Sequence, residues 1–200
     1  RDDIFKKKIY TELNVERAHT HRNFEIKLLK SASEYFASKG YFVFRMGRMQ
    51  KGKLLVNNEK VIDYAFSEYK SSFADIFLLS NCTAFFGSNS GVVTPCITFR
   101  RPIAHVNYIP LQLNHLTFYK TLPTIIKRIR CSNTGKFLSI NEIFENNLMG
   151  LSKSFEIYKK GYEFVDNTED EIKDLAVEIC NYLDGNLNYT KDDKKNDERF

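Results

Sequence analysis

Several well-known nucleotide-binding and membrane signatures are missing from this sequence of 200 residues. It contains no Gly-Lys-Ser/Thr ending of a P-loop and no G-x-G-x-x-G dinucleotide fingerprint, so the standard forms of both motifs are excluded. No D-x-D pair is present that would hold a divalent ion, and we expect no metal. No apolar run approaches the roughly 18 residues of a membrane-spanning helix, and we expect neither a transmembrane segment nor a signal peptide.

The cysteines and histidines do not form a recognisable ligand set. The cysteines have no C-x-x-C pair and no histidine at zinc-ligand spacing, and they are Cys82, Cys96, Cys131 and Cys180. We interpret them as buried, reduced thiols of a cytosolic chain, forming neither a disulfide framework nor a zinc site. His19 and His21 would need a third partner to bind a metal, so we expect a solvated loop there.

The composition favours one globular unit. Hydrophobic residues make up 42% of the sequence, which is enough for a real core. The length favours a single domain, which we place at residues 1–185, with a polar and disordered tail expected at 186–200. The net charge is +5, but lysines and acidic residues are interspersed and no basic helix stands out. A nucleic-acid partner is therefore not indicated.

The stretch from Asp75 to Asn107 is the most informative part of the chain. Ser72 and Asp75 have the S-x-x-D spacing of a capping box, which predicts a short helix through Leu79. The pattern then predicts, in order, a strand at 83–86, a loop at 87–91, a helix at 92–99 and a strand at 103–106. This succession is a βαβ unit of a parallel sheet.

The loop between this strand and helix carries small and polar residues, which are Gly87, Ser88, Asn89, Ser90 and Gly91. Ligands of doubly wound sheets bind outside the carboxyl ends of strands, against helix N-termini, where backbone N–H groups favour an anion such as phosphate. The alternative is a plain turn in which Ser88 or Ser90 caps the helix. The sequence chemistry leaves both interpretations open.

Two charged residues stand at the ends of earlier predicted strands. We expect a helix at 24–38 that Gly40 terminates, then a strand at 41–46 with Arg45 near its carboxyl end. Arg45 either contacts a ligand at that edge or is an exposed arginine in a turn. A strand at 61–66 would contain Asp63, and a carboxylate there either caps backbone amides or serves a site.

The C-terminal half gives mainly local signals. Ser139 and Glu142 predict the start of a small helix, which the segment at 151–158 could continue. A last short strand is expected at 162–165. Thr168 and Glu171 form a second capping box, which opens a helix at 169–184 with a regular apolar stripe.

Taken together, these blocks resemble a family of bacterial glycosyltransferases of the GT-B type. The resemblance rests on their order: Arg1-Asp2, His21-Arg22-Asn23, VFRMG at 43–47 (with Phe42), Ile62-Asp63-Tyr64, the central 75–91 block, the 101–107 segment and Asp166 to Ile172. It implies an α/β fold with a Rossmann-like parallel sheet and flanking helices, similar to the C-terminal, donor-binding domain of such enzymes. The chain begins at Arg1 without an initiator Met, and we expect a fragment or processed product that lacks an N-terminal partner domain.

The resemblance also implies roles for individual residues. The donor diphosphate would lie on Gly87 to Gly91, with Gly47, Arg1 and Arg22 contributing to the same site. Arg45 and Arg22 would stabilise the leaving group, because GT-B enzymes usually use arginines and helix dipoles in place of a metal. Asp63 would bind a sugar or ribose hydroxyl or orient an arginine. Asp2 would be a candidate general base, although a solvated terminal aspartate explains it equally well.

The expected activity is metal-independent transfer of a sugar from a nucleotide-diphosphate sugar to a glycan or lipid-linked acceptor of the cell envelope or a polysaccharide. No cofactor is expected besides this donor substrate, and the location would be cytoplasmic or peripheral at the inner membrane face. One alternative is a sugar-nucleotide epimerase or pyruvyl-transferase-like enzyme, which shares the sheet architecture. Another is a non-catalytic binding domain or an inactive fragment.

Overall fold

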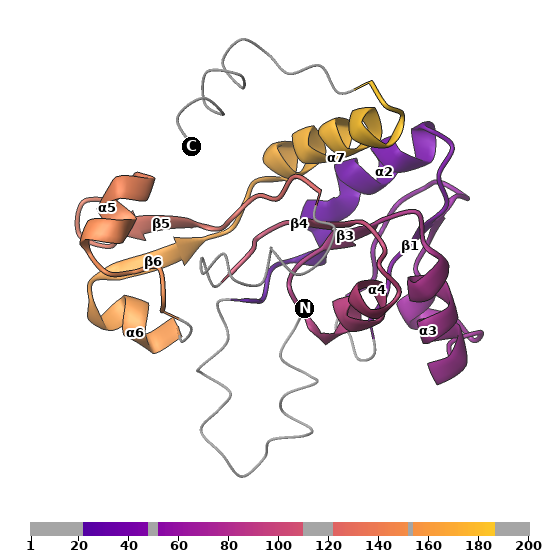
Figure 1. The fold of residues 1–200 in the computed structure, drawn as a ribbon, viewed down its shortest axis with the longest axis horizontal. Coiled ribbons are helices and arrows are strands. Elements are labelled where there is room, and N and C mark those ends of the chain that lie inside the picture. Colours follow the sequence, from indigo (N-terminus) through magenta and orange to yellow (C-terminus); the bar gives the residue numbers. More distant parts are fainter. Residues whose placement is uncertain (1–21, 48–51, 110–121, 152–153, 187–200) are drawn as a thin grey trace.

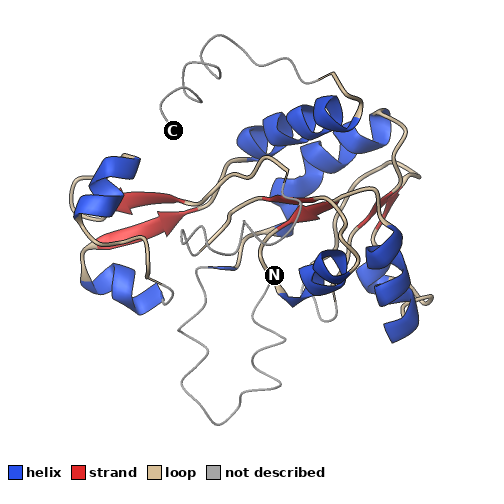
Figure 2. Ribbon diagram, viewed as in Figure 1, coloured by secondary structure: helices blue, strands red, loops and turns tan. Residues whose placement is uncertain are grey.

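The computed structural model describes residues 22–47, 52–109, 122–151 and 154–186. They form a mixed α/β structure of short strands and several helices (Figures 1 and 2). The elements are η2 (Ile26–Leu29), α2 (Lys30–Ser38), β1 (Val43–Phe44), β2 (Val61–Ile62), η3 (Tyr64–Phe66), α3 (Ser72–Asn81), β3 (Phe85–Gly87), η4 (Gly91–Val93), α4 (Thr94–Thr98), β4 (Ile103–His105), β5 (Arg128–Cys131), α5 (Ile140–Glu145), α6 (Ser154–Lys159), β6 (Tyr162–Val165) and α7 (Glu169–Leu183).

The predicted βαβ unit is present. β3 and β4 pair in parallel, with Phe85 opposite Ile103 and Gly87 opposite His105, and η4 and α4 connect them. Pro95 lies in the first turn of α4, where its missing N–H is tolerated. β1 and β2 form a second parallel pair, with Val43 opposite Val61.

The expected single parallel sheet is only partly seen. The described strands form three separate two-stranded sheets, β1–β2, β3–β4 and an antiparallel pair, β5–β6. The sequence of β5 and β6 explains the antiparallel pairing, because charged side chains alternate with apolar ones and Arg130 reaches Glu163 at 2.7 Å across the two strands. One-sided burial of this kind suits antiparallel strands.

Helices cover the parallel pairs on two opposite faces (Figure 1). On one face, α2 and α7 pack against residues of β4, and the buried side chains include Ala32, Ala104, Ile172 and Ile179. On the other face, α3 and α4 enclose a smaller cluster of Leu79, Val93, Cys96 and Ile103. Burying apolar side chains on both faces is the arrangement expected around parallel strands.

The antiparallel pair carries its own small core at one end of the molecule (Figure 2). Ile129, Ile143, Leu148 and Ile157 are buried together there, contributed by β5, α5, α6 and the intervening turn. α6 is a separate helix, so the run at 151–158 does not continue α5 as predicted. Asn147, two residues after the end of α5, has a φ of 53°, which does not continue a right-handed helix.

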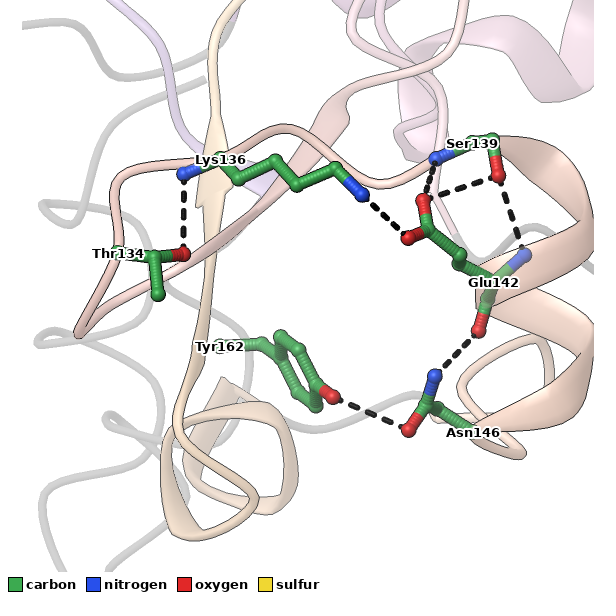
Figure 3. Close-up of polar contacts among 6 residues, drawn as sticks. All are labelled: Thr134, Lys136, Ser139, Glu142, Asn146 and Tyr162. Carbon is green, nitrogen blue, oxygen red and sulfur yellow. Dashed lines mark hydrogen bonds and ion pairs between the residues drawn. The ribbon is translucent and has the colours of Figure 1, made fainter.

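A polar network ties α5 to this pair (Figure 3). Glu142 accepts hydrogen bonds from the Ser139 amide at 2.8 Å and from the Lys136 ammonium at 2.7 Å, and these contacts lower the pKa of Glu142 to about 2. Asn146 donates to the Glu142 carbonyl and accepts from the Tyr162 hydroxyl. The predicted Ser139–Glu142 capping box is thus confirmed, and it fixes the start of α5.

Three predicted boundaries differ from those of the structure. Ser71, one residue before the predicted cap, is the N-cap of α3, and its hydroxyl accepts from the Ala74 amide. The strand expected at 61–66 ends at Ile62, because the chain then turns into η3 and the Ala65 amide donates to the Arg45 carbonyl. The helix expected from residue 24 begins as the 3-10 turn η2 and becomes α-helical only at Lys30.

The capping box of α7 gives a first prediction for stability. Thr168 accepts from the Glu171 amide at 3.2 Å and Glu171 accepts from the Thr168 amide at 2.8 Å. We expect Thr168→Ala to lower the free energy of unfolding by about 1 kcal/mol in urea denaturation, because one orphan amide of α7 loses its acceptor. Thr168→Ser, which keeps the hydroxyl, is the control, and an equal loss in both variants would contradict this role.

Candidate functional site

The loop at 87–91 leaves β3 at its carboxyl end and enters η4. Gly87 is buried, and a side chain there would approach the Phe85 ring to 3.2 Å, so the close packing of this strand end favours glycine. Gly91 is exposed with open space around it. The loop therefore starts inside the structure and emerges at the surface.

The two serines of the loop do not cap the following helical turns. Ser90 is the N-cap residue of η4, but its hydroxyl makes no capping hydrogen bond, and α4 has no side-chain cap either. Within the described residues, no hydrogen bond is made by the hydroxyl of Ser88 or Ser90. The expected capping by Ser88 or Ser90 is therefore not seen, and a ligand-binding role of the loop stays a prediction.

Asn89 links the loop to the segment that follows β4. Its side-chain amide donates to the Ile109 carbonyl at 3.4 Å, which is a long hydrogen bond. Loop and β4 exit thus lie against one another at the same edge of the β3–β4 pair. This is the edge at which α/β folds bind ligands.

His105, at the end of β4, supports the base of the loop. Its ring is fully buried, and Nδ1 lies 3.2 Å from the Gly87 carbonyl, which can only accept, so Nδ1 carries the proton. The ring lies 5.0 Å from that of Tyr108. Burial lowers the pKa of His105 to about 4, so the ring is neutral at pH 7.

This shift predicts a pH dependence of stability. The pKa of His105 is depressed in the folded state, so the unfolded chain binds more protons between pH 6.5 and 4, and stability falls as the pH is lowered through that range. The shift of the His105 pKa from 6.5 to about 4 corresponds to a loss of about 3 kcal/mol of unfolding free energy at most. We expect His105→Gln to flatten this part of the curve of unfolding free energy against pH, and an unchanged slope in the variant would contradict the assignment.

A buried polar group that the sequence did not predict joins β4 to the start of α7. The Asn107 amide donates to the Asn167 side-chain oxygen at 2.7 Å, and the Asn167 amide donates to the Asn107 side-chain oxygen at 2.7 Å. The Asn167 side-chain amide also donates to the Ile126 carbonyl. Asn107 has a φ of 51°, which asparagine tolerates better than most residues. This reciprocal pair fixes the chain direction just after β4.

Lys127 is the second unexpected member of this region. Only 3% of the residue is exposed, and its ammonium forms an ion pair with Asp166 and donates to the Asn23 carbonyl at 2.9 Å. Burial lowers the pKa of Lys127, while Asp166 opposes that shift. A signal in the sequence exists only for Asn107, which follows the apolar residues of β4 and is buried with a partner.

The structure brings Arg45 and Asp63 together. Arg45 is 6% exposed, and its guanidinium contacts Asp63 at 2.9 Å and donates to the Gly52 carbonyl at 3.0 Å. The other Asp63 oxygen accepts from the Leu54 amide at 2.7 Å. Arg45 is therefore not an exposed arginine in a turn, and Asp63 orients it. Their roles in catalysis stay predictions.

The remaining predicted site residues are placed as follows. Gly47 is buried with a φ of 152°, which favours glycine, and its carbonyl accepts from Lys70. Met46, just before it, packs against the buried cluster of Leu79, Val93, Cys96 and Ile103. Arg22 is half-buried. Arg1, Asp2, His19 and His21 lie outside the described residues, as does the tail from residue 187.

The described residues contain no group of three or more His, Cys, Asp or Glu side chains that could hold a metal ion. All four cysteines are free thiols, as expected. Cys96 and Cys180 are buried, but Cys82 and Cys131 are partly exposed, so the expectation of burial is wrong for these two. Across the described ranges, no helix is long and apolar enough to cross a membrane.

Comparison of the chain with protein-family models, with curated proteins and with solved structures gives no match.

Proposed function

We propose that this chain binds the diphosphate of a nucleotide sugar at the Ser88–Ser90 loop and serves as the donor-binding domain of a metal-independent glycosyltransferase. The observation that carries the proposal is the uncapped serine pair. Ser88 and Ser90 stand at the carboxyl end of a parallel strand, and neither hydroxyl is used to cap η4 or α4. Hydroxyl groups at such an edge suit the oxygen atoms of a phosphate.

The surroundings fit a ligand of this kind. His105 is neutral at the base of the loop, so it does not contribute a fixed charge, and its Nδ1–H is already used by Gly87. The glycine at the exposed end leaves space beside the loop. Binding would therefore depend on hydroxyl and backbone donors, with arginine assistance from Arg22 as the resemblance implies.

A thermal-unfolding screen tests the proposal. The protein is heated with ADP, CDP, GDP, UDP and dTDP in turn, and with pyrophosphate to separate the phosphate contribution from that of the base. We expect one nucleoside diphosphate to raise the unfolding temperature, with about 2.7 kcal/mol of stabilisation at 100 times its dissociation constant.

Two matched variants localise the effect. Ser90→Ala should weaken binding roughly 10- to 100-fold, since a hydrogen bond to a charged group contributes about 1.5–3 kcal/mol. Ser132→Ala removes the same hydroxyl from an exposed turn after β5 and should leave the affinity unchanged. No stabilisation by any nucleotide, or equal losses in the two variants, would contradict the proposal.

A further inference from the structure

Two of the four cysteines contact one another where α3 packs beside α4. The Cys82 and Cys96 sulfur atoms are 3.9 Å apart, although 14 positions separate these residues in the sequence. Cys82 is the C-cap residue of α3 and Cys96 lies within α4 (Figure 1). Cys131 and Cys180 have no cysteine neighbour of this kind among the described residues. The fold therefore creates one thiol pair, the Cys82–Cys96 pair.

The two thiols of the pair differ in their access to solvent. Cys82 is partly exposed, whereas Cys96 is fully buried in the cluster with Leu79, Val93 and Ile103. A dissolved oxidant can therefore reach the Cys82 sulfur but not the Cys96 sulfur. An accessible thiol with a second thiol beside it is the arrangement that redox-sensing cysteines often have.

The surroundings of Cys82 favour its thiolate form. The hydrogen bond with the Cys96 thiol and the charge of Arg101 lower the pKa of Cys82, although partial burial opposes them. The same hydrogen bond and burial raise the pKa of Cys96. Arg101 is held beside the pair, because its Nε donates to the Ser80 carbonyl and its amide donates to the Cys96 carbonyl. Since the thiolate is the nucleophile, Cys82 is the thiol that reacts first.

We propose that the Cys82–Cys96 pair is an oxidation site that a hydroperoxide converts reversibly into a disulfide. The Cys82 thiolate attacks one oxygen of hydrogen peroxide, the O–O bond breaks, and the departing hydroxide takes up a proton, which leaves a sulfenic acid on Cys82 and one water molecule. The Cys96 sulfur then attacks the Cys82 sulfur, the S–O bond breaks, and the hydroxyl group leaves with the Cys96 proton as a second water molecule. The thiols lose two electrons and two protons, and the peroxide takes up both.

The local backbone allows the two sulfur atoms to meet. They must approach from 3.9 Å to about 2.0 Å. Cys82 has an extended backbone with φ −64° and ψ 149° just after α3, so its side chain can shift without breaking a helix. The disulfide closes a ring over residues 82–96, which contains β3 and the 87–91 loop. The inference goes beyond the proposed function and does not depend on it, because it concerns thiol chemistry and needs no nucleotide.

Peptide mapping after brief treatment of the folded, reduced protein with hydrogen peroxide tests the inference. The remaining thiols are blocked with iodoacetamide, and chymotrypsin, which cleaves after Phe85 and Phe86, separates the two cysteines onto different peptides. We expect a disulfide-linked Cys82–Cys96 peptide that forms at least about 10-fold faster than Cys180 is oxidised and that disappears after dithiothreitol treatment. Cys180 is fully buried, so its thiol reports whether the chain stayed folded.

Two variants separate the roles of the thiols. Cys96→Ser removes the second thiol, so we expect Cys82 to persist as a sulfenic acid that dimedone traps. Cys131→Ser is the matched control, because Cys131 is also partly exposed and its hydrogen bond with Thr134 also lowers its pKa. We expect this variant to form the Cys82–Cys96 disulfide at the rate of the parent protein.

Three outcomes would overturn the inference. Oxidation of Cys131 with no linked Cys82–Cys96 peptide would mean that the pair is a packing contact without redox chemistry. Loss of the Cys180 thiol in parallel with the pair would mean that oxidation follows unfolding. Linkage of Cys82 to Cys131, or between two molecules, would mean that Cys96 is not its partner.

Discussion

Asp63→Ala is expected to lower the free energy of unfolding by about 3–5 kcal/mol, the largest effect we predict for a single substitution in this protein. Asp63 is the carboxylate partner of Arg45, whose side chain is only 5% exposed. Removing the carboxylate leaves a guanidinium charge in a buried position without its counter-ion. It also removes the acceptor of the Leu54 amide. Urea unfolding of the variant and the parent measures the loss.

A double-variant cycle separates the ion pair from general packing. Arg45→Met combined with Asp63→Leu removes both charges together, and we expect it to be at least 2 kcal/mol more stable than Asp63→Ala, because replacing a buried pair by apolar groups is often close to neutral. A loss below about 1 kcal/mol in Asp63→Ala would contradict the pair's structural role. If nucleotide affinity falls in the double variant while its stability is kept, the Arg45–Asp63 pair also contributes to donor binding.

Asn167→Ala is expected to destabilise the protein by about 4 kcal/mol. Its side chain accepts from the buried Asn107 amide and donates to the Ile126 carbonyl, and Asn167 is 4% exposed. Alanine leaves both backbone groups buried without partners, at about 1–3 kcal/mol each. Chemical denaturation measures the change.

Asn146→Ala is the matched control for this prediction. Asn146 also makes two side-chain hydrogen bonds, to the Glu142 carbonyl and the Tyr162 hydroxyl, but it is exposed, so water replaces them. We expect a loss of at most about 1 kcal/mol there. Similar losses of stability in Asn146→Ala and Asn167→Ala would contradict the prediction, because burial of the Asn107–Asn167 pair would then add nothing to its effect.

Local signals predicted local structure well. The capping boxes at Ser139 and Thr168, the extent of α7 and the β3–α4–β4 unit were all expected, because each depends on residues close in sequence. The end of β2 was missed because it depends on Arg45 and Asp63 meeting across 18 positions. The antiparallel β5–β6 pair was missed for the same reason, since its strands are separated by two helices.

The place of the 87–91 loop between a strand and a helical turn was predictable, but its hydrogen bonding was not. Small residues between a strand and a helix pointed to 87–91, whereas only the structure shows that Ser90 does not cap η4. Asn107 and Asn167 are 60 residues apart, so no spacing rule connects them. Lys127 and Asp166 are likewise joined only by the fold. The partners in such pairs meet only when the chain folds, so no short motif in a single sequence identifies them.

Binding of a nucleoside diphosphate at the Ser88–Ser90 loop can be followed by NMR titration of the isotope-labelled protein with the nucleoside diphosphate that gives the largest thermal shift. We expect the amide resonances of Ser88, Asn89, Ser90 and Gly91 to move together on titration, while those of Ser132 and Asn133 after β5 stay in place. Saturable binding that leaves the four loop resonances unmoved and shifts another region would contradict it.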